Sequence, residues 1–246
     1  KRNWWRRYSV PLWSQHPDHP DAYLVEEFDQ IVMSWDMTFK DTKSSDFVVG
    51  QVWARKGANV YLLDQVRKRL TFTDTLAAFQ AMVKRWPQAT AKLVEDKANG
   101  TAVINTLKSK IPGIIAITPT ESKYARANAG APIIEAGNAF LPATEIALFD
   151  TEELVDEAAA FPNATHDDQV DATSQALAYL LLDQTGALAW INHYRAKAEA
   201  AQAETDPEPE AEPDTPANPK LDPGDAMSED PDAIRKRMRD ARFRDQ

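Results

Sequence analysis

The apolar positions between residues 30 and 69 predict three neighbouring strands. Residues 30–37 (QIVMSWDM) form a β-branched and aromatic run that ends in an acid, which is typical of a central strand. After a polar loop, residues 46–55 and 60–69 flank the turn sequence KGAN, which is the pattern of a β-hairpin. We therefore expect the fold to begin with three antiparallel strands.

Helical and strand patterns alternate after this hairpin. Residues 71–86 space their apolar side chains at a helical period, with Thr71 as the expected N-cap, and stop before a proline. Residues 91–96 and 113–118 have the composition of short strands, and residues 99–110 between them have a helical pattern. A strand, a helix and a strand in this order predict a parallel pair joined by a right-handed crossover.

The element order β-β-β-α-β-α-β predicts an α/β fold with a ribonuclease H-like mixed sheet. Three antiparallel strands are followed by parallel strands, and helices cover both faces. Residues 119–145 show no clear period and are expected to be irregular. Helices follow, including a long one over about residues 167–184 that ends at Gly186 and an alanine-rich one that continues to about residue 203.

Composition divides the chain into three parts. Residues 1–28 are rich in Trp, Arg, Pro and His and are expected to be a linker or strap, whereas residues 29–203 form the expected globular domain. Residues 204–246 are the expected tail. Residues 204–232 hold eleven acids, one Lys and seven of the sixteen prolines, which predicts disorder. The last residues, 233–246, are basic and form either a solvated end or a docking peptide.

Charge and composition exclude several classes of protein. Most of the net charge of −10 lies in the tail, so residues 1–203 carry only about −4 and contact with nucleic acid is not excluded. The chain has no cysteine, which excludes disulfides and thiolate metal sites and favours an intracellular protein. No apolar run is long enough to span a membrane. The chain starts at Lys1 rather than Met, so we expect it to be part of a longer protein.

Acids stand at the ends of two predicted strands. Asp36 ends a strand expected to be buried on both faces, where an unpaired carboxylate is costly. Glu95 and Asp96 end a second strand, expected beside the first, and only one of them can point the same way as Asp36 because side chains alternate along a strand. Ligands gather at the carboxyl ends of parallel strands, so two of these acids can share a cation.

The stretch HDDQVDATSQAL adds three acids at the start of a helix. Capping explains Asp167 or Asp168, and explains Asp171 poorly because that residue is already inside the first turn. Asp168 and Asp171 are three apart and share a helix face. Their face is expected to point toward the strand ends.

Carboxylates from two strands and one helix describe an oxygen-ligand site for Mg²⁺ or Mn²⁺. Two such ions about 4 Å apart activate a water and stabilise the leaving oxygen in phosphodiester cleavage. His166 is a candidate general base or outer ligand, although a lone His before a helix more often caps the helix or pairs with a neighbouring acid. Asp46 is a further candidate that either reaches the same cavity or caps a loop.

Four sequence blocks together resemble a known family. SWDMTFKDTKSSDFVVGQVW, LVEDKANGTAVINTLK, ITPTESKYARANAGAPIIEAGNAFLP and HDDQVDATSQALAYLL occur in the order and spacing of the C-terminal nuclease domain of tailed-bacteriophage terminase large subunits. The resemblance covers about residues 29–183. It implies a ribonuclease H-like, metal-dependent endonuclease that cuts concatemeric double-stranded viral DNA, with catalytic acids at Asp36, Glu95 and Asp168. Asp167 and Asp171 stay alternatives to Asp168, and the GN..LP segment is expected to be a hairpin.

The family's proteins also carry an N-terminal packaging ATPase, and no phosphate-binding loop motif occurs in this chain. The resemblance therefore implies that the ATPase domain is missing from this chain. It further implies the portal protein, the small terminase subunit and the prohead as partners. The expected location is the packaging complex in the host cell cytoplasm, not the mature virion.

Basic residues near the acids are candidates for holding DNA phosphates. Lys97, Lys123, Arg126 and Lys43 are expected in loops around the site. No aromatic and basic recognition helix is apparent, which favours cutting without base specificity. Two other functions remain open: a junction-resolving or repair nuclease of the same fold, and a non-catalytic docking domain of the packaging motor.

Overall fold

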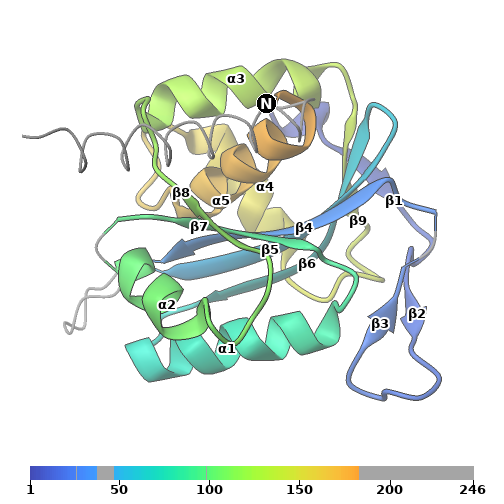
Figure 1. Cartoon of the computed structure of the whole chain (residues 1–246). Helices are drawn as coiled ribbons and strands as arrows, with labels where there is room; N and C mark the ends of the chain where they lie inside the picture. The colour runs from blue at the N-terminus through green and yellow to red at the C-terminus, as the bar shows by residue number, and fades with distance from the viewer. Residues whose placement is uncertain (26, 38–46, 98, 183–246) are drawn as a thin grey trace, which may run out of the picture. The chain divides into compact units, whose positions relative to one another are not determined.

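A seven-stranded mixed sheet is the centre of the structure (Figure 1). The computed structural model describes residues 1–25, 27–37, 47–97 and 99–182. The strands of the sheet are β1 (Arg6–Tyr8), β4 (Gln30–Met37), β5 (Val48–Lys56), β6 (Asn59–Lys68), β7 (Ala91–Glu95), β8 (Ile114–Ile117) and β9 (Ala139–Pro142). Their order across the sheet is β1-β9-β6-β5-β4-β7-β8. A separate pair, β2 (Ser14–Gln15) and β3 (Tyr23–Leu24), lies in the N-terminal segment.

The predicted first half of the sheet is confirmed. Strands β4, β5 and β6 are antiparallel neighbours, and β7 and β8 extend the sheet in parallel beyond β4. The tight turn between β5 and β6 contains Gly57 with φ of 60°, a conformation that glycine adopts without steric cost. The predicted hairpin and the predicted parallel pair follow from these local patterns. Strand β4 becomes a central strand flanked on both sides.

The prediction that residues 119–145 are irregular is wrong. They contain helix α3 (Lys123–Glu135) and strand β9, which is parallel to both β6 and β1 rather than part of a hairpin. Alanine, glycine and an internal Pro132 give α3 no apolar stripe, which is why its sequence lacks a helical period. Contact with a neighbouring helix and capping by Ser122, whose Oγ accepts from the Ala125 amide at 3.2 Å, stabilise it instead.

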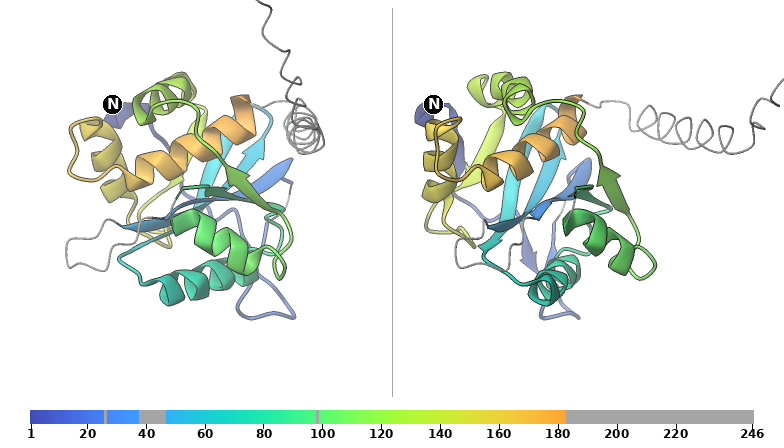
Figure 2. Two further views of the ribbon diagram at one scale, coloured as in Figure 1. Left: turned by 60° about the vertical axis from the view of Figure 1, so that its left-hand side comes forward. Right: turned by 90° about the vertical axis from the view of Figure 1, so that its left-hand side faces the viewer.

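Helices cover both faces of the sheet, as predicted (Figure 2). Helices α1 (Phe72–Arg85) and α2 (Asn99–Leu107) lie on one face, and α3, α4 (Thr151–Ala160) and α5 (Asp168–Leu177) lie on the other. Thr71 caps α1 as predicted, since its side chain accepts from the Asp74 amide. The expected long helix starts one residue late and changes to a π-helical turn at Ala178–Leu182. Its expected end at Gly186 and the alanine-rich helix to residue 203 lie outside the described residues.

Two apolar cores hold these layers together. On the side of α1, the rings of Trp35 and Phe79 pack in a tilted arrangement with 5.1 Å between their centroids, and both side chains are fully buried. On the side of α5, Trp53, Leu93 and Leu177 belong to the second core. Burial of side chains of this size stabilises the fold by roughly 2 kcal/mol each relative to exposure. The sheet is therefore buried on both faces at its centre.

The N-terminal segment packs along this domain. A short 3₁₀ turn (Arg2–Trp4) precedes β1, which pairs with β9 at the edge of the sheet. The hydroxyl of Tyr8 donates to the carbonyl of Leu62 at 2.7 Å. The ring of Trp13 meets Trp86, on the side of α1, at 5.9 Å. The segment thus contributes an edge strand, while its expected role as a linker stays a prediction.

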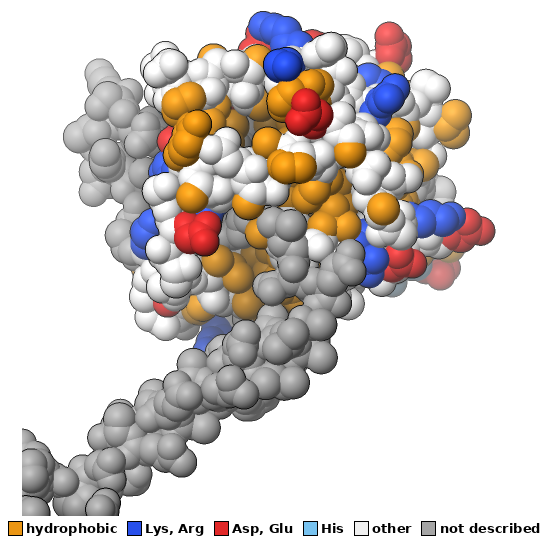
Figure 3. Space-filling view, turned by 90° about the horizontal axis from the view of Figure 1, so that it is seen from above, with side chains coloured by type: hydrophobic (Ala, Val, Ile, Leu, Met, Phe, Trp, Pro, Cys, Tyr) orange, Lys and Arg blue, Asp and Glu red, His pale blue; other side chains and the backbone are white. Residues whose placement is uncertain are grey.

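Hydrophobic side chains are exposed in several patches on the face of the molecule seen from above (Figure 3). Tyr124 on α3 is 57% exposed, and a pocket of about 40 Å³ opens among α3, α4 and α5, with Gly130, Leu154 and Leu177 in its wall. Charged side chains are scattered over this face rather than gathered in one patch.

Within the described ranges, no helix has the length and apolar character needed to cross a bilayer.

We predict that Gly50→Ala destabilises the domain. Gly50 lies directly opposite Trp35 in the β4–β5 pair, and a Cβ at this position would stand 2.6 Å from three carbons of the indole ring. Because Trp35 is fully buried, relief requires a shift of the core, and the free energy of unfolding should fall by about 1–3 kcal/mol. Urea unfolding measures this change. In a Trp35→Leu background the same substitution should cost less; an equal cost in both backgrounds would contradict the assigned contact.

Candidate active site

Two acids meet where β4 and β7 end side by side. The two strands are parallel and pair Trp35 with Val94. Asp36 and Glu95 therefore follow at the same, carboxyl-terminal end of the two strands. Ser34, two residues before Asp36, points to α5, and its Oγ donates to the carbonyl of Ala172 at 2.7 Å. Because side chains alternate, Asp36 is directed to the same face. The predicted neighbourhood of these two strand ends is confirmed.

The structure separates Glu95 from Asp96. Leu93 belongs to the core on the α5 side, and Glu95, two residues further, is directed to that face as well. Asp96 instead accepts a hydrogen bond from the Thr101 hydroxyl at 2.6 Å, at the start of α2. Of the two adjacent acids, Glu95 is therefore the one that shares the face of Asp36.

Helix α5 brings the other predicted acids over these strand ends. Asp168 and Asp171 are each 4% exposed, within the first turn of α5. A hydrogen bond from the Gln175 side chain to Ser34 Oγ, at 2.9 Å, adds to the contact between α5 and β4. The face of α5 that carries buried acids thus lies against the strands that carry Asp36 and Glu95.

Asp167, one of the two acids that capping could explain, does not cap α5 through its side chain. Asp167 occupies the N-cap position but makes no side-chain hydrogen bond to the helix. Glu157 of α4 caps the helix instead: one of its oxygens accepts from the amides of Gln169 at 2.7 Å and Val170 at 3.0 Å. A carboxylate at a helix N-terminus is also favoured by the helix dipole. Because Glu157 satisfies these amides, the carboxylate of Asp167 is turned to another partner.

A buried chain of amide side chains connects this cap to the sheet. The side chain of Gln169 donates to Glu157 at 2.7 Å and accepts from Gln65 of β6 at 2.8 Å. Gln65 in turn accepts from Gln51 of β5 at 2.8 Å, and Gln51 accepts from the indole of Trp53 at 2.9 Å. Buried polar groups are costly unless hydrogen-bonded, so this chain holds α5 in one position on the sheet. These residues were not predicted from the sequence; the signal was a glutamine inside each of two apolar strands and another in the first turn of a helix.

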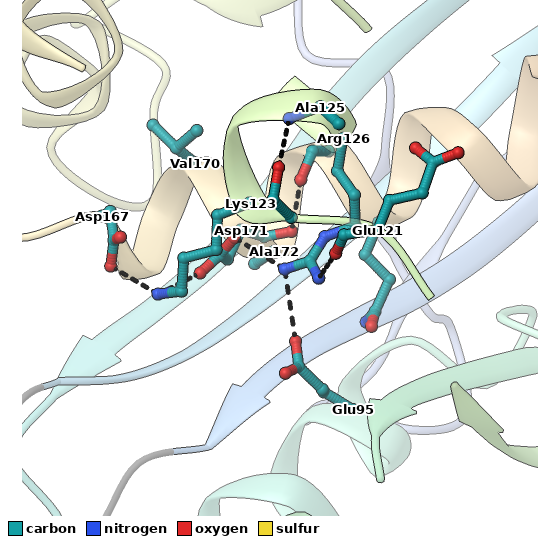
Figure 4. A network of polar contacts seen from close by, with 12 residues as sticks. Glu95, Glu121, Lys123, Ala125, Arg126, Asp167, Val170, Asp171 and Ala172 are labelled. Carbon is teal, nitrogen blue, oxygen red and sulfur yellow. Dashed lines mark hydrogen bonds and ion pairs between the residues drawn. The ribbon is translucent and has the colours of Figure 1, made fainter. Parts of the chain in front are cut away.

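Two basic residues of α3 reach the acids (Figure 4). Lys123 Nζ lies 2.8 Å from Asp167 Oδ1 and 2.6 Å from Asp171 Oδ2. Arg126 Nη2 lies 2.9 Å from Asp171 Oδ1 and 3.5 Å from Glu95 Oε2. The expectation that these two basic residues lie in loops is wrong, because both belong to α3. They contact carboxylates rather than open solvent.

The pKa of Asp36 is strongly raised by its surroundings. Burial raises its pKa well above the ordinary value, and three neighbouring carboxylates raise the pKa further. These carboxylates belong to Asp171, Asp168 and Glu95. The concentration of negative charge around one buried acid is a feature of functional sites.

The basic partners partly offset this charge. Burial also raises the pKa of Asp171, against the opposing effect of Lys123 and Arg126. Burial lowers the pKa of Lys123, but its hydrogen bonds to Asp167 and Asp171 outweigh this and hold the pKa above the ordinary value. Lys123 therefore stays charged, and the acids keep a close counter-ion.

The remaining predicted residues lie around this cluster or outside the described part. His166 Nδ1 is 3.9 Å from Asp168 Oδ2, and its ring meets Phe47 edge-on at 5.0 Å between centroids. Lys97 Nζ lies 2.8 Å from Glu95 Oε1. Asp46 and Lys43 fall outside the described residues. The structure thus brings His166 and Lys97 to the edge of the cluster.

The donor set fits a hard divalent cation in its chemistry. Four carboxylates, from Asp36, Glu95, Asp168 and Asp171, share one end of the sheet, and oxygen ligands suit Mg²⁺ and Mn²⁺. In the part of the chain that the structure describes, no three ligating side chains already converge on one point. The basic groups of α3 lie among the carboxylates instead (Figure 4). The acids are gathered, but not yet arranged around an ion.

Comparison with known structures gives the same fold. The large terminase nuclease from thermophilic phage G20c with bound magnesium has a TM-score of 0.50 and 14% identity over 72% of this chain and 94% of that chain. The same nuclease with bound zinc gives 0.50 and 17%, over 73% and 95%. The large terminase from another thermophilic bacteriophage, in complex with ADP, gives 0.50 and 12%, over 64% of this chain and 41% of that chain. This chain therefore matches less than half of that longer protein.

The sequence itself carries the family assignment. No curated protein matches the chain. The sequence model described as the terminase RNaseH-like domain matches residues 33–180, which include Asp36, Glu95 and the acids of α5. This range is more than half of the chain, and it confirms the resemblance seen in the four sequence blocks. The chain belongs to the terminase RNase H-like domain family.

Proposed function

We propose that this chain is the nuclease domain of a phage DNA-packaging terminase and that it cuts double-stranded DNA by metal-dependent phosphodiester hydrolysis. The observation that carries this proposal is the gathering of Asp36, Glu95 and two acids of α5 at one end of the sheet. A set of buried and half-buried carboxylates this close together is destabilising unless cations balance its charge. Family membership and the magnesium-bound G20c nuclease support the same proposal.

Asp36, Glu95, Asp168 and Asp171 are the proposed ligands of two Mg²⁺ or Mn²⁺ ions. Bound there, the ions would activate a water and stabilise the leaving oxygen. The chain itself holds the oxygen donors on two strands and one helix. These elements are rigid and place the donors at a partly buried end of the sheet. His166, close to Asp168, is the proposed outer ligand or general base. Its ring contact with Phe47 fixes its orientation.

The basic residues around the acids are the proposed contacts to the DNA backbone. Lys97, Lys123 and Arg126 all lie within ion-pair distance of the site acids, so a phosphate held by them would lie beside the carboxylates. Backbone contacts of this kind carry no base specificity. We infer cutting of concatemeric viral DNA without a fixed sequence.

The same proposal covers the neighbouring parts of the protein, its partners and its place of action. We infer a packaging ATPase domain on the N-terminal side, beyond the strap of residues 1–28, and an acidic tail over residues 204–246 that follows the nuclease domain at 29–203. The proposed partners are viral DNA, the portal protein, the small terminase subunit and the prohead. The proposed place of action is the packaging complex in the host cytoplasm.

Catalysis of this kind depends on where α5 lies. Two of the four proposed ligands are on its first turn, and that turn is anchored through the amides that Glu157 caps. The second oxygen of Glu157 accepts from the Gln169 side chain at 2.7 Å and lies 3.6 Å from Arg67 Nη2. Glu157 therefore acts as a positioning residue for Asp168 and Asp171.

We predict that Asp36→Asn abolishes cutting by the full chain. Loss of one ligand charge should reduce nicking and linearisation of plasmid in Mn²⁺ by at least about a hundredfold, since changes even to outer partners of metal ligands cost up to that factor. EDTA should abolish the wild-type reaction. Asp21→Asn is the matched control, because Asp21 is an exposed acid whose contact is Lys84.

Three other results would contradict the proposed site or favour another function. Unchanged cleavage by Asp36→Asn would remove this site from consideration. A strong preference for four-way junctions over linear duplex would favour a junction-resolving nuclease. Failure of the intact chain to bind Mn²⁺ in calorimetry would favour a non-catalytic docking domain.

We predict that Glu157→Ala lowers both stability and metal binding. It leaves buried amide groups of α5 without an acceptor and Arg67 without one carboxylate, so the free energy of unfolding should fall by about 3 kcal/mol. Glu157→Gln keeps an acceptor for the two backbone amides and should cost less. Glu152→Ala, which removes a 57% exposed carboxylate of the same helix, should change stability by about 0–1 kcal/mol.

Urea unfolding and Mn²⁺ calorimetry separate these variants. The positioning role requires Glu157→Ala to bind Mn²⁺ more weakly under conditions where the protein is fully folded. Wild-type affinity in the folded variant would assign Glu157 to stability alone.

A further inference from the structure

The two basic side chains of α3 lie among the acids that are the proposed metal ligands. Arg126 lies between an acid of α5 and an acid of β7, at 2.9 Å from Asp171 and 3.5 Å from Glu95. Lys123 contacts the second oxygen of Asp171 at 2.6 Å. Both oxygens of one proposed ligand are therefore taken up by protein cations (Figure 4).

We propose that Lys123 and Arg126 are built-in competitors of the metal ions: they neutralise the acids when no metal is bound, and metal binding releases them to hold the DNA phosphate. This inference rests on the proposed function, because it assumes that these acids are metal ligands. It assigns to α3 the control of when the site accepts metal and DNA.

Charge explains why such counter-ions are needed. Asp171 is 4% exposed, and an ionised carboxylate at that depth is strongly destabilising unless it is paired. The negative charges of Asp168 and Glu95 act on the same region, as the raised pKa of Asp36 reflects. The cations of α3 thus hold together a group of acids that would otherwise repel one another.

Charge makes the two kinds of partner compete for the same oxygens. Mg²⁺ takes oxygen ligands at about 2.1 Å and tolerates little deviation from octahedral geometry. An ammonium nitrogen 2.6 Å from Asp171 Oδ2 and a divalent ion bound to the same oxygen would repel each other strongly, because both are cations at short range. This fits the finding that no three ligating side chains converge in the described part of the chain.

Release of the cations need not undock α3. Lys123 and Arg126 are three residues apart and lie on one face of its first turn. Further along the helix, Gly130 packs closely against Leu177 of α5, so an added Cβ would stand 3.3 Å from that side chain. Long side chains can therefore change partner while α3 stays in place through its small residues.

The released side chains would meet a suitable new partner. A guanidinium and an ammonium group bind phosphate oxygens strongly, and the guanidinium can do so through two parallel hydrogen bonds. Lys123 is 47% exposed on its side chain, so it lies at the opening of the site. The scissile phosphate must approach the same acids, which places it within reach of both groups.

We predict opposite effects of Lys123→Met on metal and on DNA. Removal of the competitor should raise the Mn²⁺ affinity of the full chain about 5- to 150-fold, the usual range for coupling between sites. Removal of the phosphate contact should weaken binding of duplex DNA in Ca²⁺, which stands in for the catalytic metal. Calorimetry with Mn²⁺ and fluorescence anisotropy with labelled duplex measure the two quantities.

Three variants control this test. Lys123→Arg keeps the charge and should retain the wild-type Mn²⁺ affinity. Lys84→Met removes an exposed lysine of α1 that contacts Asp21, and should leave both quantities unchanged. Arg126→Gln repeats the test from the other oxygen of Asp171 if Lys123→Met does not fold. A variant that folds only in the presence of Mn²⁺ would also support the inference, since the ion would replace the missing cation.

The outcomes distinguish this inference from the proposed function. If the wild type binds Mn²⁺, Asp36→Asn does not, and Lys123→Met binds with unchanged or lower affinity, the competitor role is overturned while the metal site stands. If the wild type binds no Mn²⁺ at all, both are overturned. A parallel loss of metal and DNA binding in Lys123→Met would show a structural role only.

Discussion

The attachment of α5 to the sheet is the constraint on which the rest of the site depends. The interface between α5 and the sheet contains buried polar groups that hydrogen-bond one another: Gln169 of α5 with Glu157 and Gln65, and Ser34 of β4 with the backbone of Ala172. A polar interface of this kind permits only one placement of the helix, since a shift would break several buried hydrogen bonds together. The acids of its first turn are held over β4 and β7 as a consequence.

The parts of the fold set by local pattern could be predicted from the sequence. A β-branched run marks β4, and alternation along a strand predicts that only one of Glu95 and Asp96 shares the side of Asp36. The register of β4 and β7 then identifies that acid as Glu95. Helix α1 shows its start through Thr71. In these cases the information lies within a few neighbouring residues, and propensity and burial favour the same structure.

The parts set by contacts between distant segments could not be predicted. Glu157 caps a helix that begins eleven residues later in the chain, so no capping pattern reveals it. Helix α3 lacks an apolar period because small residues pack it against α5, as Gly130 does against Leu177. The ion pairs of Lys123 depend in turn on α3 being a helix. One error in secondary structure therefore hid the fact that an expected loop lysine is a counter-ion of the site acids.

The pairing of basic side chains with the site acids also explains how an acidic domain can act on DNA, as proposed. Residues 1–203 carry a net charge of only about −4, and part of the negative charge lies in the site acids. Without metal, Lys123 and Arg126 are engaged with those acids and contribute little attraction for a phosphate. Each divalent ion would add two positive charges and would free basic side chains, so the local sign of the surface would reverse. In this proposal, DNA affinity would be created at the site itself, by the same metal binding that makes the site competent.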